Sequence, residues 1–155
     1  GRLGKETKRL SNFLRRHEHV AIDTPVFIYH FEDHPRYSRL TVPLFEAIES
    51  GRCHAATSVL SRLEVLVKPL REGRDDLADV YRLILDTFPN LQQIGVDGRV
   101  ADMAATLQAA HGLSTPDSLH LAGAIIAGCS AFITNDGEIP ALESMEVLTL
   151  ETLLA

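Results

Sequence analysis

The sequence has no tryptophan, only two cysteines and no long apolar run. Cys53 and Cys129 stand far apart and form no Cys-x-x-Cys pair, so we expect reduced, partly buried thiols rather than redox or metal-binding groups. A membrane-spanning helix needs roughly 20 consecutive apolar residues. Neither such a run nor a signal-peptide pattern is present. We therefore expect a cytoplasmic protein with no membrane partner.

Glycine-rich phosphate loops are also missing. Gly95-x-x-Gly98 lacks the other positions of a dinucleotide-binding motif, which argues against cofactors of that class. What the sequence does have is 155 residues, 45% of them apolar. That length and apolar content suit one folded domain that buries a proper core without disulfides.

Basic residues are scarce, with 15 Lys and Arg against 21 Asp and Glu, a net charge of −6. Residues 1–20 carry six basic and two acidic residues, which leaves nine basic and nineteen acidic residues for the rest of the chain. Because phosphate affinity comes largely from Lys and Arg, net charge alone argues against nucleic acid. We divide the chain into a basic N-terminal arm or helix, residues 1–19, and a single body, residues 20–155. The arm could be a solvated helix, an RNA contact or a protein contact.

Short apolar segments alternate with longer amphipathic ones along the body. Strands are predicted at about 20–22, 53–57, 91–96, 131–134 and 147–150, and helices at about 26–32, 40–50, 59–71, 74–88, 98–111 and 115–127. Thr24 and Thr115 each precede a proline and are predicted to cap the helix that follows. This alternation predicts an α/β fold, a three-layer α/β/α sandwich with a mainly parallel sheet of four to five strands.

Acidic residues fall where the strands of such a sheet end. Asp23 follows the first strand, Asp136 follows the fourth, and Asp117 lies at the start of the helix that leads into the fourth strand. The carboxyl ends of parallel strands share one edge of the sheet, and function gathers there. We therefore expect these three carboxylates to lie close together.

Glu64 lies within the helix predicted at 59–71. On a helical projection, one set of apolar side chains forms a stripe that we expect to be buried: Leu60, Leu63, Leu66, Val67 and Leu70. Glu64 falls one step beyond Leu60, at the rim of this stripe. It could thus join the other acids at the sheet edge.

Carboxylates that crowd together raise one another's pKa, so a cluster of four requires a cation. Oxygen ligands suit Mg²⁺ or Mn²⁺, which also accept phosphate oxygens. Such a site could activate water against a phosphodiester and stabilise the charge on the leaving oxygen.

Four segments, in order, resemble those of PIN-domain ribonucleases, specifically the VapC-type toxins of bacterial VapBC toxin–antitoxin pairs. They are Ala21-Ile22-Asp23-Thr24, Thr57-Ser58-Val59-Leu60-Ser61-Arg62-Leu63-Glu64, Thr115-Pro116-Asp117-Ser118-Leu119-His120-Leu121-Ala122 and Ile133-Thr134-Asn135-Asp136. The resemblance covers roughly residues 20–150. The charged segment before the first strand departs from the family pattern.

The resemblance implies a PIN-like fold and an Mg²⁺- or Mn²⁺-dependent endoribonuclease that leaves 3′-hydroxyl and 5′-phosphate ends. It implies a metal-binding and catalytic quartet of Asp23, Glu64, Asp117 and Asp136, with Thr134 and Asn135 shaping the site. The implied partners are an RNA substrate, a cognate antitoxin whose tail covers the acidic groove, and a second copy in a homodimer.

Other interpretations remain open at this point. A non-catalytic protein of the same fold could bind RNA or a protein partner. His30 and His34 have a spacing that can bind zinc, although Phe31 replaces the Glu of the metalloprotease motif. Asp23-Thr24 could form an acyl phosphate, against which Pro25 argues. Ser118 and His120 are expected to pack or donate hydrogen bonds within the site, and His120 could also touch substrate.

Overall fold

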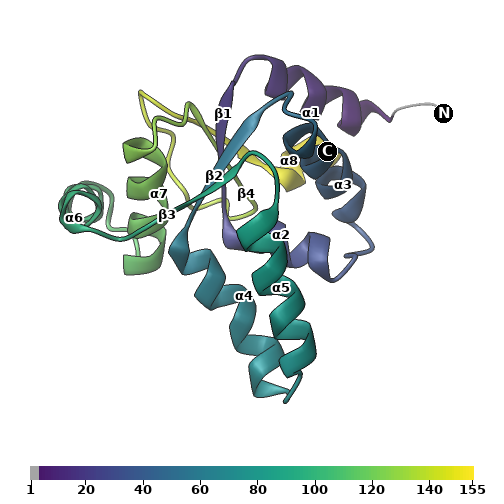
Figure 1. Cartoon of the computed structure of the whole chain (residues 1–155). Coiled ribbons are helices and arrows are strands. Elements are labelled where there is room, and N and C mark those ends of the chain that lie inside the picture. The colour runs from purple at the N-terminus through teal and green to yellow at the C-terminus, as the bar shows by residue number, and fades with distance from the viewer. Residues whose placement is uncertain (1–3) are drawn as a thin grey trace.

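The computed structural model describes residues 4–155 as one sheet covered by helices on both faces (Figure 1). All neighbouring strands pair in parallel, and the sheet has five strands in the order β3-β2-β1-β4-β5. The strands are β1 (His19–Ile22), β2 (His54–Ser58), β3 (Leu91–Ile94), β4 (Ala131–Thr134) and β5 (Glu146–Thr149). The predicted α/β/α sandwich is thus confirmed, and the sheet is wholly parallel.

Helices precede, connect and follow these strands. They are α1 (Lys5–Arg15), α2 (Thr24–Phe31), α3 (Ser38–Glu49), α4 (Val59–Arg71), α5 (Asp75–Thr87), α6 (Gly98–His111), α7 (Thr115–Ile126) and α8 (Leu150–Leu154). Helix α6 is capped by Asp97, as predicted, and ends at Gly112, whose φ of +66° suits glycine. Helices α4 and α5 run side by side and extend beyond the sheet (Figure 1).

The core has two halves because strand side chains alternate between the faces of the sheet. Val20 and Ile22 of β1 face one half, which is covered by helices α1 to α5 and α8. Ala21 of β1 and Phe132 of β4 face the other half, which is covered by α6 and α7. The three central strands β1, β2 and β4 are buried on both faces, whereas the edge strands β3 and β5 are only partly covered.

Two predicted helix caps are each displaced by one residue. Asp23, not Thr24, caps α2 and accepts a hydrogen bond from the backbone N–H of Thr24. Ser114, not Thr115, caps α7 and accepts from the N–H of Asp117. In both helices proline still lies at a position that tolerates the missing N–H. The Asp23 carboxylate therefore belongs to the helix start as well as to the strand end.

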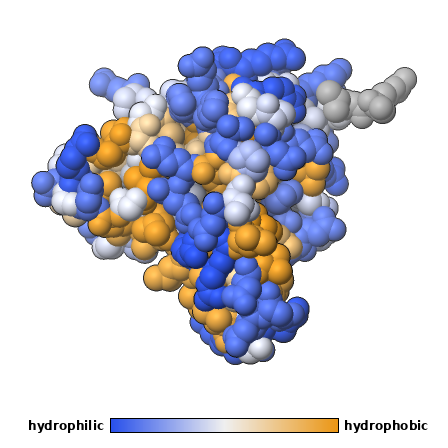
Figure 2. Space-filling model, in the orientation of Figure 1, coloured by the Kyte–Doolittle hydropathy of each residue, from blue (hydrophilic) through white to orange (hydrophobic). Residues whose placement is uncertain are grey.

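Helix α4 buries only Leu66 of the predicted stripe. Its buried side chains are Ser61, Val65, Leu66 and Pro69. Leu63 is 59% exposed, and Val59, Val67 and Leu70 are exposed beside it. Because α4 packs on α2 and α5 and extends beyond the sheet, only one of its two apolar faces is covered. Figure 2 shows the resulting apolar surface on the projection that α4 and α5 form.

The described part of the N-terminal segment forms helix α1, which packs on the rest of the protein. Leu10, Phe13 and Leu14 of α1 are buried and pack with α3 and α8. Arg9 donates to the backbone oxygen of Ala155 at 2.8 Å, and Arg16 pairs with Glu146. Part of the predicted basic arm, residues 1–3, lies outside the described residues.

Both cysteines are buried and unpaired, as predicted. Burial raises the pKa of Cys129 to about 11, which makes its thiolate rare at neutral pH. Across residues 4–155, no helix is long and apolar enough to cross a membrane.

Candidate active site

Asp23 lies at the carboxyl edge of the sheet, between β1 and α2, and is only 5% exposed. One carboxylate oxygen, Oδ1, accepts the Thr24 N–H at 2.9 Å. The other, Oδ2, accepts the Thr134 hydroxyl at 2.7 Å. Burial raises the pKa of Asp23, whereas His120 and these hydrogen bonds act to lower it. A carboxylate in this setting is stabilised by any cation that reaches it.

Asp117 reaches the same edge from the first turn of α7. Its carboxylate is close enough to Asp23 to contribute to the raised pKa of Asp23. Among residues 4–155 the Asp117 carboxylate accepts no hydrogen bond, while its backbone N–H is used by the cap residue Ser114. Asp117 is half-buried, and both of its carboxylate oxygens are available.

Glu64 approaches from α4, where its side chain is 36% exposed. Its Oε1 lies 2.7 Å from Nε2 of His120 and accepts the Thr24 hydroxyl at 3.0 Å. The His120 hydrogen bond, above all, lowers the pKa of Glu64. His120 Nε2 also lies 4.0 Å from Oδ1 of Asp23, so this imidazole stands between the two carboxylates.

Asp136 reaches the site through the turn that follows β4. Its backbone N–H donates to the Thr134 hydroxyl at 3.0 Å, the same hydroxyl that contacts Asp23. Its Oδ1 accepts the Glu138 N–H at 2.9 Å. The Asp136 backbone is therefore linked to Asp23 through the Thr134 hydroxyl, while one carboxylate oxygen of Asp136 is hydrogen-bonded within its own turn.

Asn135 points to a different part of the molecule. Its side-chain nitrogen donates to the Tyr29 hydroxyl at 3.2 Å, and its oxygen accepts the Glu151 N–H at 2.9 Å. These contacts connect the β4 turn to α2 and α8. Asn135 thus holds the β4 turn against α2 and α8, and its side chain does not contact Asp23.

The donors at this edge fit a hard divalent cation in chemical type, since Asp23, Glu64 and Asp117 offer only carboxylate oxygens. In residues 4–155, however, no three His, Cys, Asp or Glu side chains converge closely enough to hold an ion by themselves. Mg²⁺ commonly uses one or two carboxylates and completes its shell with water and substrate phosphate. Asp23 and Asp117, whose charges interact, are the candidate pair for such an ion.

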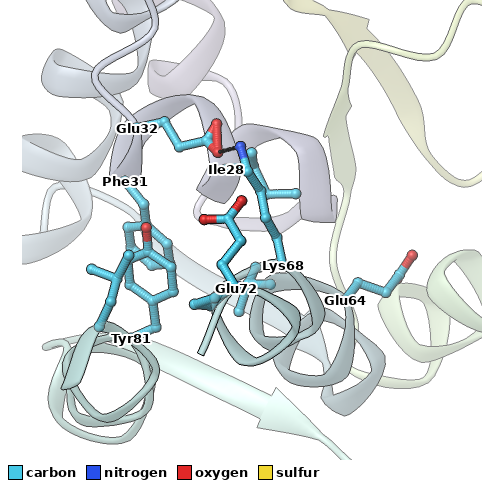
Figure 3. A pocket seen from close by; sticks show the side chains of 10 residues that line it. Ile28, Phe31, Glu32, Glu64, Lys68, Glu72 and Tyr81 are labelled. Carbon is cyan, nitrogen blue, oxygen red and sulfur yellow. Dashed lines mark hydrogen bonds and ion pairs between the residues drawn. The ribbon is translucent and has the colours of Figure 1, made fainter. Parts of the chain in front are cut away.

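A pocket of about 430 Å³ adjoins the site between α2, α4 and α5. Its lining is mostly apolar, with Phe31 stacked on Tyr81, and its rim carries the Lys68–Glu32 ion pair. Figure 3 shows the Glu64 carboxylate pointing away from that ion pair. Glu64 therefore separates the apolar pocket from the acidic edge.

The hydrogen bond expected of His120 is present, with Glu64 as its partner, which the sequence does not identify. For Thr24 the sequence indicates a cap or a neighbour of an acyl phosphate at Asp23, and not a hydrogen bond to Glu64. The signal for His120 was its position three residues after Asp117, which places both side chains on the same face of α7. His30 and His34, whose spacing in the sequence could bind zinc, contact different groups. His30 contacts the Thr41 hydroxyl, whereas Nδ1 of His34 accepts backbone N–H groups of Arg36 and Tyr37.

The sequence model of the PIN domain matches residues 20–144. The chain belongs to the PIN domain family. The match spans β1 through the turn after β4, and it includes all four of the predicted acids. No curated protein sequence matches the chain.

Solved structures share this PIN fold. A toxin–antitoxin complex from Klebsiella pneumoniae matches at 20% identity with a TM-score of 0.64, over 84% of this chain and 97% of that one. VapBC2 from Rickettsia felis, bound to a fragment of its promoter DNA, matches at 14% identity with a TM-score of 0.65, over 84% of this chain and 98% of that one. DNA-bound VapBC from Salmonella typhimurium matches at 14% identity with a TM-score of 0.66, over 84% of this chain and 97% of that one. At such identities the likeness establishes the fold.

Proposed function

We propose that this PIN domain protein is a divalent-metal-dependent endoribonuclease, the VapC-type toxin of a toxin–antitoxin pair that acts in the cytoplasm. The observation that carries the proposal is the Asp23 carboxylate, which is 5% exposed at the carboxyl edge of the sheet and interacts with the charge of Asp117. Two carboxylates placed this way in a folded protein favour a bound cation. Membership of the PIN family supports the nuclease assignment.

Each acid has a distinct task in this proposal. Asp23 and Asp117 hold the first Mg²⁺ or Mn²⁺, and Glu64 ligates a second ion or orients the attacking water. Asp136 completes the quartet from the β4 turn. When bound, the ion supplies a Lewis acid that polarises the phosphodiester and favours ionisation of the water. Thr134 keeps the Asp23 carboxylate in place by donating to Oδ2.

The charge distribution is consistent with RNA as substrate once the ion is present. The body, residues 20–155, carries ten more acidic than basic residues and by itself repels phosphate. A divalent ion cancels the charges of Asp23 and Asp117, and its open coordination positions accept phosphate oxygens. We therefore expect this protein to bind RNA poorly without metal.

Two protein partners belong to the proposal, a cognate antitoxin and a second copy of this chain. Support for the antitoxin comes from the similar structures, which are toxin–antitoxin complexes. The antitoxin tail would cover the groove next to Glu64. The exposed apolar stripe of α4 is a surface suited to a homodimer contact.

Cleavage of structured RNA by the purified protein tests the proposed activity. With Mg²⁺ or Mn²⁺ the wild type should cut RNA internally and leave 5′-phosphate ends. Asp23→Asn and Asp117→Asn should each lower the rate by at least about 100-fold, since metal assistance is worth several kcal/mol. Asp97→Asn, which changes an acid that caps α6, is the matched control and should retain activity.

Equal cleavage by wild type and both site variants in EDTA would contradict the proposal. Tight RNA binding without any metal-dependent turnover would instead favour the non-catalytic alternative. The 5′-phosphate is checked by ligation of the products, which requires that end.

A further inference from the structure

The two carboxylate oxygens of Glu64 are not equivalent. Oε1 accepts hydrogen bonds from His120 at 2.7 Å and from Thr24 at 3.0 Å. Both donors are buried, each with 4% of its surface exposed, whereas Glu64 is partly open. Among residues 4–155, Oε2 has no hydrogen-bond partner. One oxygen is thus anchored to the protein interior, and the other is available to a ligand.

The direction of these hydrogen bonds follows from the protons available. A carboxylate only accepts hydrogen bonds, and Oε1 of Glu64 lies 2.7 Å from Nε2 of His120. Nε2 of His120 must therefore carry the proton that it shares with Oε1. A protonated ring nitrogen has no lone pair for a metal ion, so His120 does not ligate through this atom.

Thr24 is oriented by a chain of buried hydroxyls. Thr57 gives its proton to the Ile22 carbonyl oxygen at 2.8 Å. The Ser61 hydroxyl lies 2.8 Å from Thr57 and 3.0 Å from Thr24. Because Thr57 and Thr24 both donate elsewhere, Ser61 gives its single proton to one of these two oxygens. This network leaves the Thr24 proton directed at Glu64.

We propose that His120, together with Thr24, is a positioning residue that anchors Oε1 of Glu64, so that Glu64 acts on the divalent ion or the water through Oε2 alone. The inference rests on the proposed nuclease function and deepens it. Helix α7 then has two tasks, because it carries Asp117 for the ion and His120 for the orientation of Glu64. Partners that orient a metal ligand typically change metal affinity or activity by about 10- to 100-fold when removed.

The test measures Mn²⁺ binding by electron paramagnetic resonance of the free ion and, separately, single-turnover RNA cleavage. His120→Met removes the donor but keeps apolar bulk, and it should weaken Mn²⁺ binding about tenfold or more. His120→Gln places an amide nitrogen near the Nε2 position and should restore binding to near wild type. Thr24→Val and Thr24→Ser form the same kind of pair for the second donor.

Ser118→Ala serves as the matched control. Ser118 is buried on the same helix, donates to the Ser114 carbonyl oxygen and does not contact Glu64. Its Mn²⁺ affinity should equal that of the wild type. Circular dichroism and thermal unfolding in EDTA verify that each variant is folded. If His120→Met does not fold, the two Thr24 variants still test the proposal.

Two results would overturn the positioning role. The first is His120→Met and Thr24→Val binding Mn²⁺ as tightly as the wild type. The second is His120→Gln losing as much affinity as His120→Met, which would mean that the ring itself is required. In either case Asp23→Asn should still abolish binding if the proposed function holds. Mn²⁺ binding unaffected by Asp23→Asn would count against the proposed function itself.

Discussion

At the scale of single residues, Asp23 combines three tasks in one carboxylate. It caps α2, accepts the Thr134 hydroxyl and is the buried member of the acidic edge. Burial raises its pKa above the ordinary value, so ionised Asp23 destabilises the folded protein when no cation is present. Function and stability are therefore opposed at this residue.

Asp23→Asn is expected to raise the melting temperature in EDTA at neutral pH by a few degrees, because ~1 kcal/mol shifts a domain of this size by roughly 2–4 °C. Asparagine can still cap α2. The pKa of Asp23 is raised in the folded state, so the wild-type penalty is absent below the unfolded value of 3.8. It then grows as the pH rises through the folded-state pKa.

Thermal unfolding in EDTA from about pH 3 to about pH 7 checks this dependence. The two melting temperatures should converge at the acidic end and separate toward neutral pH. Saturating Mn²⁺ should reverse the order, because only the wild type gains stability from binding the ion. A variant less stable than wild type in EDTA at neutral pH would mean that the lost hydrogen-bond geometry outweighs desolvation.

The acids were predictable residue by residue because a strand end and a helix start are local features. Asp23 and Asp117 are positioned by such features. His120 was less accessible to prediction, since its role depends on Glu64, which reaches it from a different helix. A contact between two helices has no signature in the spacing of either one.

At the scale of elements, α1 lies far from the acidic edge. It leads into β1 at the amino edge of the sheet, where Arg16 pairs with Glu146 and His17 bonds to Ser130. Figure 1 places α1 at the opposite end of the molecule from α4 and α5. We propose that residues 20–155 carry the nuclease and that α1 stabilises it without touching RNA.

Phe13→Ala should lower the free energy of unfolding by about 3 kcal/mol, the usual cost of removing a buried phenyl ring. Phe13 is 3% exposed and packs in the same core as β1.

Lys5→Glu combined with Lys8→Glu changes exposed charges of the same helix. Because α1 is remote from the site, this pair should leave the salt dependence of RNA affinity unchanged.

Urea unfolding of Phe13→Ala measures its loss of stability. RNA binding by the charge-reversed protein at two salt concentrations, with Ca²⁺ in place of Mg²⁺, measures the salt dependence of its RNA affinity. If α1 contacts phosphate, each lost contact would reduce the salt slope by about one. A shallower slope in the charge-reversed protein would thus assign α1 to the RNA interface.

Helix α4 was the element that periodicity described least well. Its apolar residues occupy two faces, and the spacing alone does not say which face meets the protein. The predicted stripe through Leu63 and Leu70 is exposed, whereas Ser61 is fully buried because it bonds to Thr24 and Thr57. A serine at the centre of a helix interface is explained only by the hydroxyls of other elements.

At the scale of the whole molecule, the exposed stripe of α4 leaves an apolar surface next to the acidic edge. Its residues are Val59, Leu63, Val67 and Leu70. An apolar surface of this kind on a folded protein indicates a partner. The proposed homodimer would bury it and bring two acidic edges near one interface.

Leu63→Glu should convert the homodimer to a monomer, because Leu63 is the most exposed residue of the stripe and the charge would be desolvated at a contact. Light scattering coupled to size exclusion measures the mass of wild type and variant. Val42→Glu changes a similarly exposed valine on α3 and should leave the dimer intact. A monomeric wild type at micromolar concentration would contradict the homodimer.

The sequence by itself determined the α/β/α architecture and the edge at which Asp23, Asp117 and Asp136 lie. It could do so because strand length, helix caps and the parallel connection are local or topological properties. Tertiary structure alone decided that Glu64 bonds to His120 and Thr24, that α4 exposes Leu63 and that Asn135 faces away from Asp23. Each of these depends on which side chains of distant segments meet. Such meetings are set by packing, and packing leaves no periodic mark in any one segment.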